Sequence, residues 1–185
     1  MQRFFHSLGI KHRLIVSYTI VITVYVVAMP AIAIVLGDLL DRVLNHPSSV
    51  VPPPYNYVIA IPIITLCWAL IIWTSRSIVI IGKGHPAEIF KVEVSPVTQH
   101  LVVVGPYHRI RNPMATANVT YMFIGLGLLT NSLSMMLFYP VALLIAFLYF
   151  KVFEEPAMLE RFGSEYAEYR VKTPMFFSSF SRAKR

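Results

Sequence analysis

The sequence predicts an all-α integral membrane protein: a helical bundle of about four transmembrane helices with a C-terminal helical hairpin and a cytoplasmic amphipathic helix. Of the 185 residues, 56% are hydrophobic and only 14% are charged, so a soluble domain of this size would expose large apolar patches. Several uncharged stretches provide the ~20 helical residues that are needed to cross ~30 Å of hydrocarbon. The length suits one compact bundle without a separate soluble module.

The first two spans are expected in the N-terminal half. Residues 14–37 contain no Lys, Arg, Asp or Glu, and this run is too long for a signal peptide, so we expect a retained membrane anchor. Prolines at positions 47 and 52–54 lack the amide donor that a helix requires, and they predict a loop. A second span of about residues 57–74 follows, and it is expected to end before Arg76.

The other two spans are expected to form a hairpin. Residues 112–150 carry no formal charge, which is too long for one span and enough for two helices joined by a tight turn. Thr130-Asn131-Ser132 is typical of such a turn, so the spans are predicted at about residues 114–129 and 133–150. Gly125 and Gly127 in the third span would allow another helix to approach closely.

The positive charges predict the orientation. Four spans place both termini on one side of the membrane, and that side holds every Lys and Arg except Arg42. Positive residues favour the cytoplasmic side, so both termini and the loop between spans two and three are predicted to be cytoplasmic. The net charge of +7 fits membrane lipids as partners rather than nucleic acid, because no base-stacking pattern accompanies it. Cys67 is the only cysteine, so we expect neither a disulfide nor a metal site.

The first candidate site is the cytoplasmic loop of residues 76–111. Glycines and prolines punctuate it, and Asn112-Pro113 stops it in an extended conformation before a helix that begins near Met114. The free amides of that helix N-terminus could hold a carboxylate or hydroxyl of a ligand. An ordinary turn with lipid-facing arginines explains the pattern equally well.

The second candidate site is Glu154-Glu155, where span four is expected to leave the membrane. Two carboxylates at a helix C-terminus oppose the helix dipole, and a bound cation would remove that cost. The alternative is a solvated pair neutralised by Lys151 or Arg161. Because spans three and four form one hairpin, both candidate sites emerge at the same membrane face and can line one pocket.

A helix is also expected after Pro156. Apolar residues recur there at helical spacing, opposite three glutamates, which predicts an amphipathic helix that lies on the membrane or caps the bundle. The apolar positions are Leu159, Phe162, Tyr166 and Tyr169.

These segments resemble the isoprenylcysteine carboxyl methyltransferase and phospholipid methyltransferase superfamily of membrane enzymes, over roughly residues 82–174. The likeness divides the chain into the N-terminal helices of residues 1–81 and a methyltransferase-like region of residues 82–185. The matching motifs are Gly82-Lys83-Gly84-x-Pro86, Leu101-Val102-x-x-Gly105-Pro106-Tyr107-x-x-x-Arg111-Asn112-Pro113-Met114, and Glu154-Glu155-x-x-x-Leu159-x-x-Phe162-Gly163-x-x-Tyr166-x-x-Tyr169.

The resemblance implies S-adenosyl-L-methionine as cofactor, bound at the cytoplasmic ends of the last helices, and a lipid-like acceptor that enters from the bilayer. The family commonly has His where Asn112 stands, and the carboxyl methyltransferases have Arg where this chain has Phe150. The second difference argues against a prenylcysteine carboxylate as acceptor. By position, the implied cofactor contacts are Gln99, His100, Leu101, Val102, Tyr107, Asn112, Pro113, Met114 and Glu154.

The sequence thus favours a membrane methyltransferase that acts on a lipid-like or hydrophobic small molecule by carboxyl-O or amine-N methylation, with an isoprenylcysteine-like acceptor as one option. Methyl transfer needs alignment and a dry site more than a strong acid or base, and no catalytic residue is assigned. One alternative is a membrane NAD(P)H-dependent reductase of the sterol-reductase type. Another is a non-catalytic membrane subunit or small transporter, which would predict ionisable residues inside the spans. The acceptor and the oligomeric state are left open.

Overall fold

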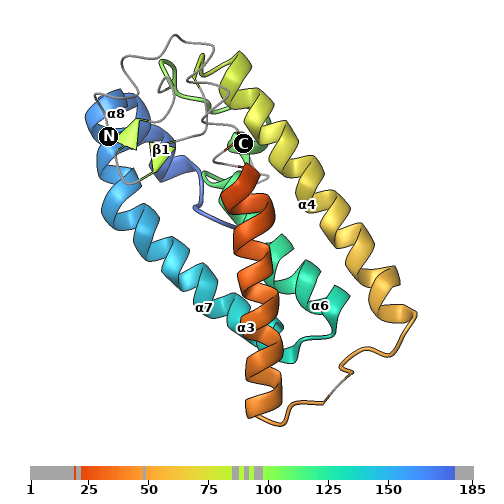
Figure 1. Ribbon diagram of the computed structural model, residues 1–185. Helices are drawn as coiled ribbons and strands as arrows, with labels where there is room; N and C mark the ends of the chain where they lie inside the picture. Colours follow the sequence, from red (N-terminus) through yellow and green to blue (C-terminus); the bar gives the residue numbers. More distant parts are fainter. Residues whose placement is uncertain are drawn as a thin grey trace.

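The computed structural model describes residues 19, 22–47, 49–84, 88–89, 92–93 and 98–177, and most of them are helical (Figure 1). The only sheet in this part of the chain is an antiparallel pair of two-residue strands. The elements in chain order are η1 (Ile22–Ala28), α3 (Met29–Val43), α4 (Tyr55–Ile80), β1 (Glu88–Ile89), β2 (Val92–Glu93), η2 (Gly105–His108), α5 (Pro113–Thr120), η3 (Tyr121–Gly125), α6 (Leu126–Thr130), α7 (Leu133–Tyr149), η4 (Phe150–Glu154) and α8 (Glu155–Lys172).

The prediction of an all-α bundle with membrane-spanning helices is confirmed. Three helices in the described residues are long and apolar enough to cross a membrane: Thr23–Val43, Tyr55–Ile80 and Leu133–Lys172. The expected third span, residues 114–129, is a continuous helical segment made of α5, η3 and α6, but it is not among these three. Its status as a fourth span stays a prediction.

The helices are longer than the charges led us to predict. The first was expected over residues 14–37, of which 14–18, 20 and 21 lie outside the described residues, and it continues to Val43 because Asp38 pairs with Arg42 one turn later at 2.8 Å. The second was expected to end at Thr74 and continues to Ile80, with Arg76 inside it. A single arginine near a helix end keeps its charge in water while its stem lies along apolar surface, so it does not terminate the helix.

The hairpin forms as predicted. Asn131 adopts the left-handed conformation with φ 58° and ends α6, and the Ser132 hydroxyl accepts a hydrogen bond from the Met135 amide at the start of α7. The expected close approach is also seen, because a Cβ on Gly125 would lie 2.8 Å from the Ile64 side chain of α4. Glycine therefore allows α4 to pack directly against the hairpin.

The fourth expected helix does not end at residue 150. It runs on through η4 into α8 without a break as far as Phe162. Only Gly163, with φ 54° and ψ −128°, departs from helical geometry and redirects the last turns. The predicted helix after Pro156 is therefore present, and its lying on a membrane surface stays a prediction.

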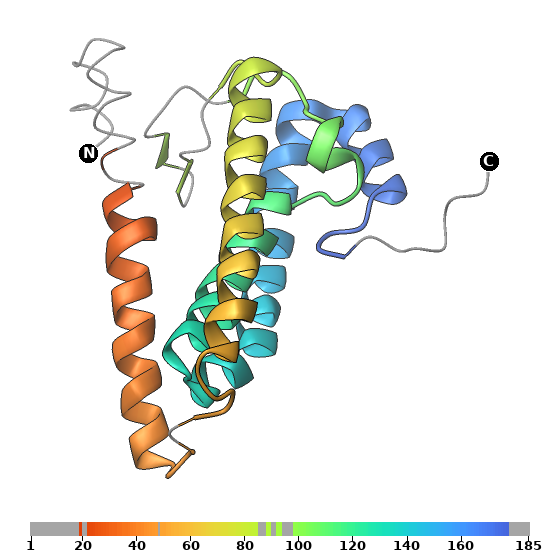
Figure 2. The ribbon, with the colours of Figure 1, turned by 90° about the vertical axis from the view of Figure 1, so that its right-hand side faces the viewer.

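The helices define two ends of the bundle (Figures 1 and 2). At one end, here named the α8 end, α8 and η2 lie beside the last turns of α4. At the opposite end, here named the far end, the loop of residues 44–54 lies beside the turn at Asn131. The core between them includes Cys67 of α4, Ala117 of α5, Tyr121 of η3 and Met135 of α7.

At the far end a polar clasp ties α3 to α7. The Ser134 amide donates to Asp41 Oδ1 at 2.8 Å, and His46 Nδ1 lies 3.0 Å from the same carboxylate oxygen. The Asn131 side-chain oxygen accepts hydrogen bonds from the amides of Val50 and Val51. These contacts hold α3, the loop of residues 44–54 and the start of α7 together at the far end.

Candidate active site at the α8 end

The segment of residues 98–112 packs against α8. Leu101 is buried and forms a cluster with Tyr166 and Tyr169, two residues that follow the bend at Gly163. The Tyr169 hydroxyl donates a hydrogen bond of 2.6 Å to the backbone oxygen of Tyr107. α8 therefore holds the 3₁₀ turn that carries Tyr107 in place.

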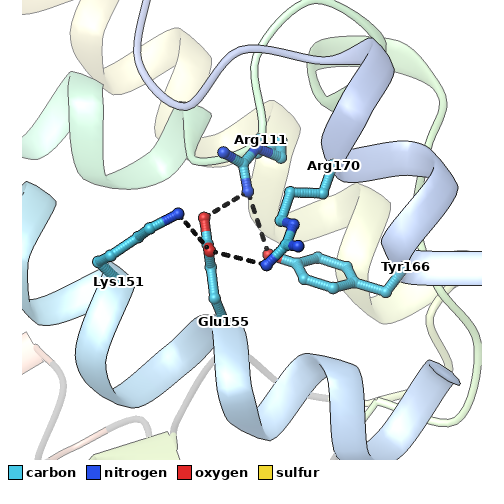
Figure 3. Close-up of polar contacts among 5 residues, drawn as sticks. All are labelled: Arg111, Lys151, Glu155, Tyr166 and Arg170. Carbon is cyan, nitrogen blue, oxygen red and sulfur yellow. Dashed lines mark hydrogen bonds and ion pairs between the residues drawn. The ribbon is translucent and has the colours of Figure 1, made fainter.

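Glu155 is the centre of a charged cluster (Figure 3). It is only 3% exposed, and Arg111 Nη1 donates to its Oε1 at 2.6 Å. Lys151 Nζ and Arg170 Nη1 reach its other oxygen at 3.0 and 3.3 Å. Such pairing, with hydrogen bonds to both oxygens, is what allows a carboxylate to be buried. The cluster joins the end of the loop, η4 and the last turns of α8.

Arg111 is the most enclosed of the three cations. Its side chain is 10% exposed, against 52% for Lys151 and 37% for Arg170. Its Nη1 also lies 3.5 Å from the Tyr166 hydroxyl. Its Nε is buried and has no hydrogen-bond partner among the described residues.

Glu154 differs from its neighbour. Its side chain is exposed, and its charge acts on Tyr107: burial first, and then the negative charge of Glu154, raise the pKa of the Tyr107 hydroxyl above its usual value near 10. Tyr107 is therefore a neutral phenol at physiological pH. The interaction brings the two candidate segments to the same end of the molecule.

The N-terminus of α5 is covered by the segment that follows α8. The Arg111 amide donates to the Pro174 oxygen at 2.8 Å, and the Asn112 amide donates to the Met175 oxygen at 3.1 Å. Phe176 is buried, with its ring 5.9 Å from that of Phe150. We name residues 173–177 the C-terminal strap, because they lie across the start of α5.

The nine residues that we expected to contact a cofactor fall into two groups. Gln99 and His100 are exposed, and their amides donate to the Gly82 oxygen beside the end of α4. Seven others lie at or near the contact between the loop, the α5 N-terminus and η4. These seven are Leu101, Val102, Tyr107, Asn112, Pro113, Met114 and Glu154. Their binding of a cofactor stays a prediction. Pro86, which belongs to the matched motif, lies outside the described residues.

The interpretation of Glu155 needs correction. We expected it at a helix C-terminus, solvated or compensated by a bound cation, but the helix continues and Glu155 is buried among three basic side chains. Lys151 is one partner of Glu155, as the alternative proposed. Arg161 donates to the Thr98 hydroxyl at 3.4 Å. The sequence analysis missed Arg111 and Arg170 as partners. Arg111 stands inside the matched motif, and this was the one available signal.

An open, shallow groove of about 540 Å³ lies along one face of α4 near the α8 end. A Cβ on Gly105, the first residue of the turn that carries Tyr107, would lie 3.5 Å from Trp73 Nε1. The groove therefore ends close to the turn of the candidate site. Its lining is Ala69, Ile72, Trp73, Arg76, Ser77, Ile80 and Ile81.

Together these features define a helical membrane protein with a cluster of buried and half-buried charged side chains at one end of its helices. The phospholipid methyltransferase family matches residues 55–165, from the start of α4 into α8. This is more than half of the chain, and the chain therefore belongs to the phospholipid methyltransferase family. Comparisons with curated proteins and with solved structures gave no match.

Proposed function

We propose that this protein is an S-adenosyl-L-methionine-dependent methyltransferase that acts at the membrane on a lipid-like or hydrophobic small molecule, by carboxyl-O or amine-N methylation. The observation that carries the proposal is the family match over residues 55–165, which includes both segments of the candidate site. The bound cofactor would supply a methyl group on a positively charged sulfur. The chain would supply binding, alignment and exclusion of water.

The charged and polar groups at the α8 end match the groups of this cofactor. Its amino-acid part carries an ammonium and a carboxylate, and the α8 end offers the exposed carboxylate of Glu154 together with the buried, unpartnered Nε of Arg111. Tyr107 stays neutral and so adds no competing negative charge. The α5 N-terminus contributes the positive end of a helix dipole.

Water would be excluded by the C-terminal strap and by aromatic residues. Phe150 contacts both Tyr149 and Phe176 at ring distances of 5.6 and 5.9 Å. An arginine at this position would have to replace that packing, which supports an acceptor other than a prenylcysteine carboxylate. The groove along α4 would bring an apolar acceptor from the bilayer toward Gly105 and the neighbouring Tyr107. Both termini and the site would face the cytoplasm, in accordance with the positive charges.

The test is to incubate membranes that contain the protein with a labelled methyl donor and to identify the labelled product by mass spectrometry. Labelled S-adenosylmethionine and labelled NADPH, bound to the purified protein in detergent, would separate a methyltransferase from a reductase. Binding of NADPH alone would overturn the proposal. Binding of neither compound, with no labelled product, would favour a non-catalytic membrane subunit.

Glu154→Gln tests the role of the exposed carboxylate. The change removes the negative charge and keeps the size and hydrogen-bonding oxygen, so we expect affinity for S-adenosylmethionine to fall about tenfold, the ordinary value of a charged contact. Isothermal titration calorimetry measures the change. Glu160→Gln, at an exposed position six residues further along the chain in α8, is the matched control and should bind normally. Equal affinity in both variants would remove Glu154 from the site.

A further inference from the structure

Gly163 is the point at which α8 changes direction. Its φ of 54° and ψ of −128° lie outside helical geometry, in a region that glycine adopts readily and residues with a side chain rarely adopt. A Cβ added at this position would meet no neighbouring atom within 4 Å. The glycine is therefore required by the backbone conformation and not by crowding, and this one conformation sets the direction of the chain that follows.

Residues 164–177, here named the C-terminal lid, are tied to the rest of the α8 end by directional hydrogen bonds. The Tyr169 hydroxyl donates to the Tyr107 oxygen at 2.6 Å. The strap at the end of the lid accepts hydrogen bonds from the amides of Arg111 and Asn112 at 2.8 and 3.1 Å. Hydrogen bonds weaken steeply with distance and angle, so these contacts hold the lid in one position over η2 and the start of α5.

The buried carboxylate stays paired if the lid moves away. Arg170 and Tyr166 belong to the lid, whereas Lys151, Glu155 and Arg111 do not (Figure 3). Arg111 at 2.6 Å and Lys151 at 3.0 Å would keep both oxygens of Glu155 bonded after Arg170 has left. Opening therefore avoids the large cost of an uncompensated buried charge. It uncovers the apolar cluster around Tyr166, so the closed form is the major one.

The lid covers positions at which the proposed cofactor is expected to bind. Leu101 is 8% exposed, and Tyr166 and Tyr169 of the lid pack against it. Pro113, the first residue of α5, is less than 2% exposed, and the strap lies across the two residues before it. A nucleoside-sized ligand would have to displace the lid to contact Leu101 or the start of α5.

We propose that the C-terminal lid pivots at Gly163 between this closed form and a minor open form that admits the methyl donor to the start of α5. In the open form the helix up to Phe162 stays in place and only residues 164–177 move. The hydrogen bond from Tyr169 to Tyr107 is the latch of the closed form. Admission of the methyl donor rests on the proposed function, whereas the pivot stands on Gly163 and on the contacts of the lid.

Hydrogen–deuterium exchange of the full chain in detergent detects the open form. The amides of Arg111 and Asn112 are the reporters, because their acceptors leave with the lid. The Thr116 amide is the reference, because it donates at 3.0 Å to the Asn112 oxygen, which does not belong to the lid. After correction for intrinsic rates, we expect exchange about tenfold or more faster at the reporters, through local opening. Equal corrected rates would overturn the pivot.

Tyr169→Phe tests the latch. The change removes one hydroxyl and keeps the ring, so exchange at the two reporter amides should become about fivefold faster, the ordinary value of one hydrogen bond. Tyr139→Phe is the matched control, because it removes a hydroxyl that pairs with Thr120 at 3.1 Å, outside the lid. Thermal unfolding of both variants verifies the fold. An equal acceleration at Thr116 would indicate general destabilisation and would overturn the latch.

Gly163→Ala tests the pivot itself. A Cβ disfavours the backbone conformation of the closed form without meeting a neighbour, so reporter exchange should become about fivefold faster or more. Ser164→Ala, at the next and exposed position, is the control and should leave the reporters unchanged. Unchanged or slower reporter exchange in Gly163→Ala would show that the lid does not turn at this residue.

S-adenosylhomocysteine tests whether the lid closes over the ligand. If the ligand binds under the closed lid, reporter exchange should slow about 100-fold at a ligand concentration 100 times the dissociation constant that calorimetry measures. Binding without any slowing would overturn the lid as a gate. If the protein does not bind S-adenosylhomocysteine, the proposed function fails, and the ligand-free comparisons alone decide the pivot.

Discussion

The two ends of the bundle differ in how they pair a carboxylate that is largely removed from solvent. At the far end one carboxylate, Asp41, is satisfied by a backbone amide and by His46. At the α8 end one carboxylate, Glu155, is surrounded by three cations. Among the described residues each end also has one buried atom without a hydrogen-bond partner, Asn56 Oδ1 and Arg111 Nε. The first belongs to a neutral amide and the second to a permanently charged guanidinium. The far end thus satisfies its carboxylate with neutral hydrogen-bond donors and one histidine, whereas the α8 end gathers three basic side chains on one buried carboxylate.

The largest loss of stability is expected for Glu155→Ala, which removes the carboxylate on which the comparison rests at the α8 end. Removing the shared carboxylate leaves Arg111 buried without a counter-charge, so we expect a loss of about 3–4 kcal/mol in the free energy of unfolding. Denaturant-induced unfolding in detergent micelles measures it. Glu168→Ala, in an exposed pair with Lys172, should cost less than about 1 kcal/mol. Similar losses in the two variants would show that the cluster is solvated rather than buried.

A smaller effect is expected for Asp41→Asn at the far end. The amide keeps one oxygen for the Ser134 amide but loses the charge that His46 contacts, so stability should fall by about 1–2 kcal/mol. Affinity for S-adenosylhomocysteine should not change, because the clasp lies at the opposite end from the candidate site (Figure 1). Asp38→Asn, which alters only the exposed pair with Arg42, is the control. A tenfold loss of affinity in Asp41→Asn would contradict the separation of the two ends.

The smallest loss of stability is expected for Ser132→Ala, which tests a single neutral hydrogen bond at the far end. Its hydroxyl caps α7 by accepting the Met135 amide at 3.2 Å, and loss of such a cap costs about 1 kcal/mol. Thermal unfolding at neutral pH measures the shift. The exposed Ser164→Ala in α8 should leave the unfolding temperature unchanged, and an equal shift in both variants would argue against the cap.

Hydropathy and turn residues predicted the helical spans well, because those signals are local. The turn at Asn131 and the close approach at Gly125 follow from residue types that permit few other structures. Helix ends were less predictable: charges at Asp38 and Arg76 indicated ends, yet a local ion pair and an apolar stem kept them inside helices. The charged cluster could not be predicted from sequence. Arg111 meets Glu155 across 44 positions, and only the packing of α8 on the loop brings them together.

The C-terminal strap sets an order of assembly. Residues 173–177 supply the carbonyl groups that the amides of Arg111 and Asn112 require, and they follow every helix of the bundle in the chain. During synthesis the helices can therefore enter the membrane while the α5 N-terminus is still uncovered. The α5 N-terminus is therefore covered last, when the strap folds back, and a nascent chain that stops before Thr173 would leave the amides of Arg111 and Asn112 without these two acceptors.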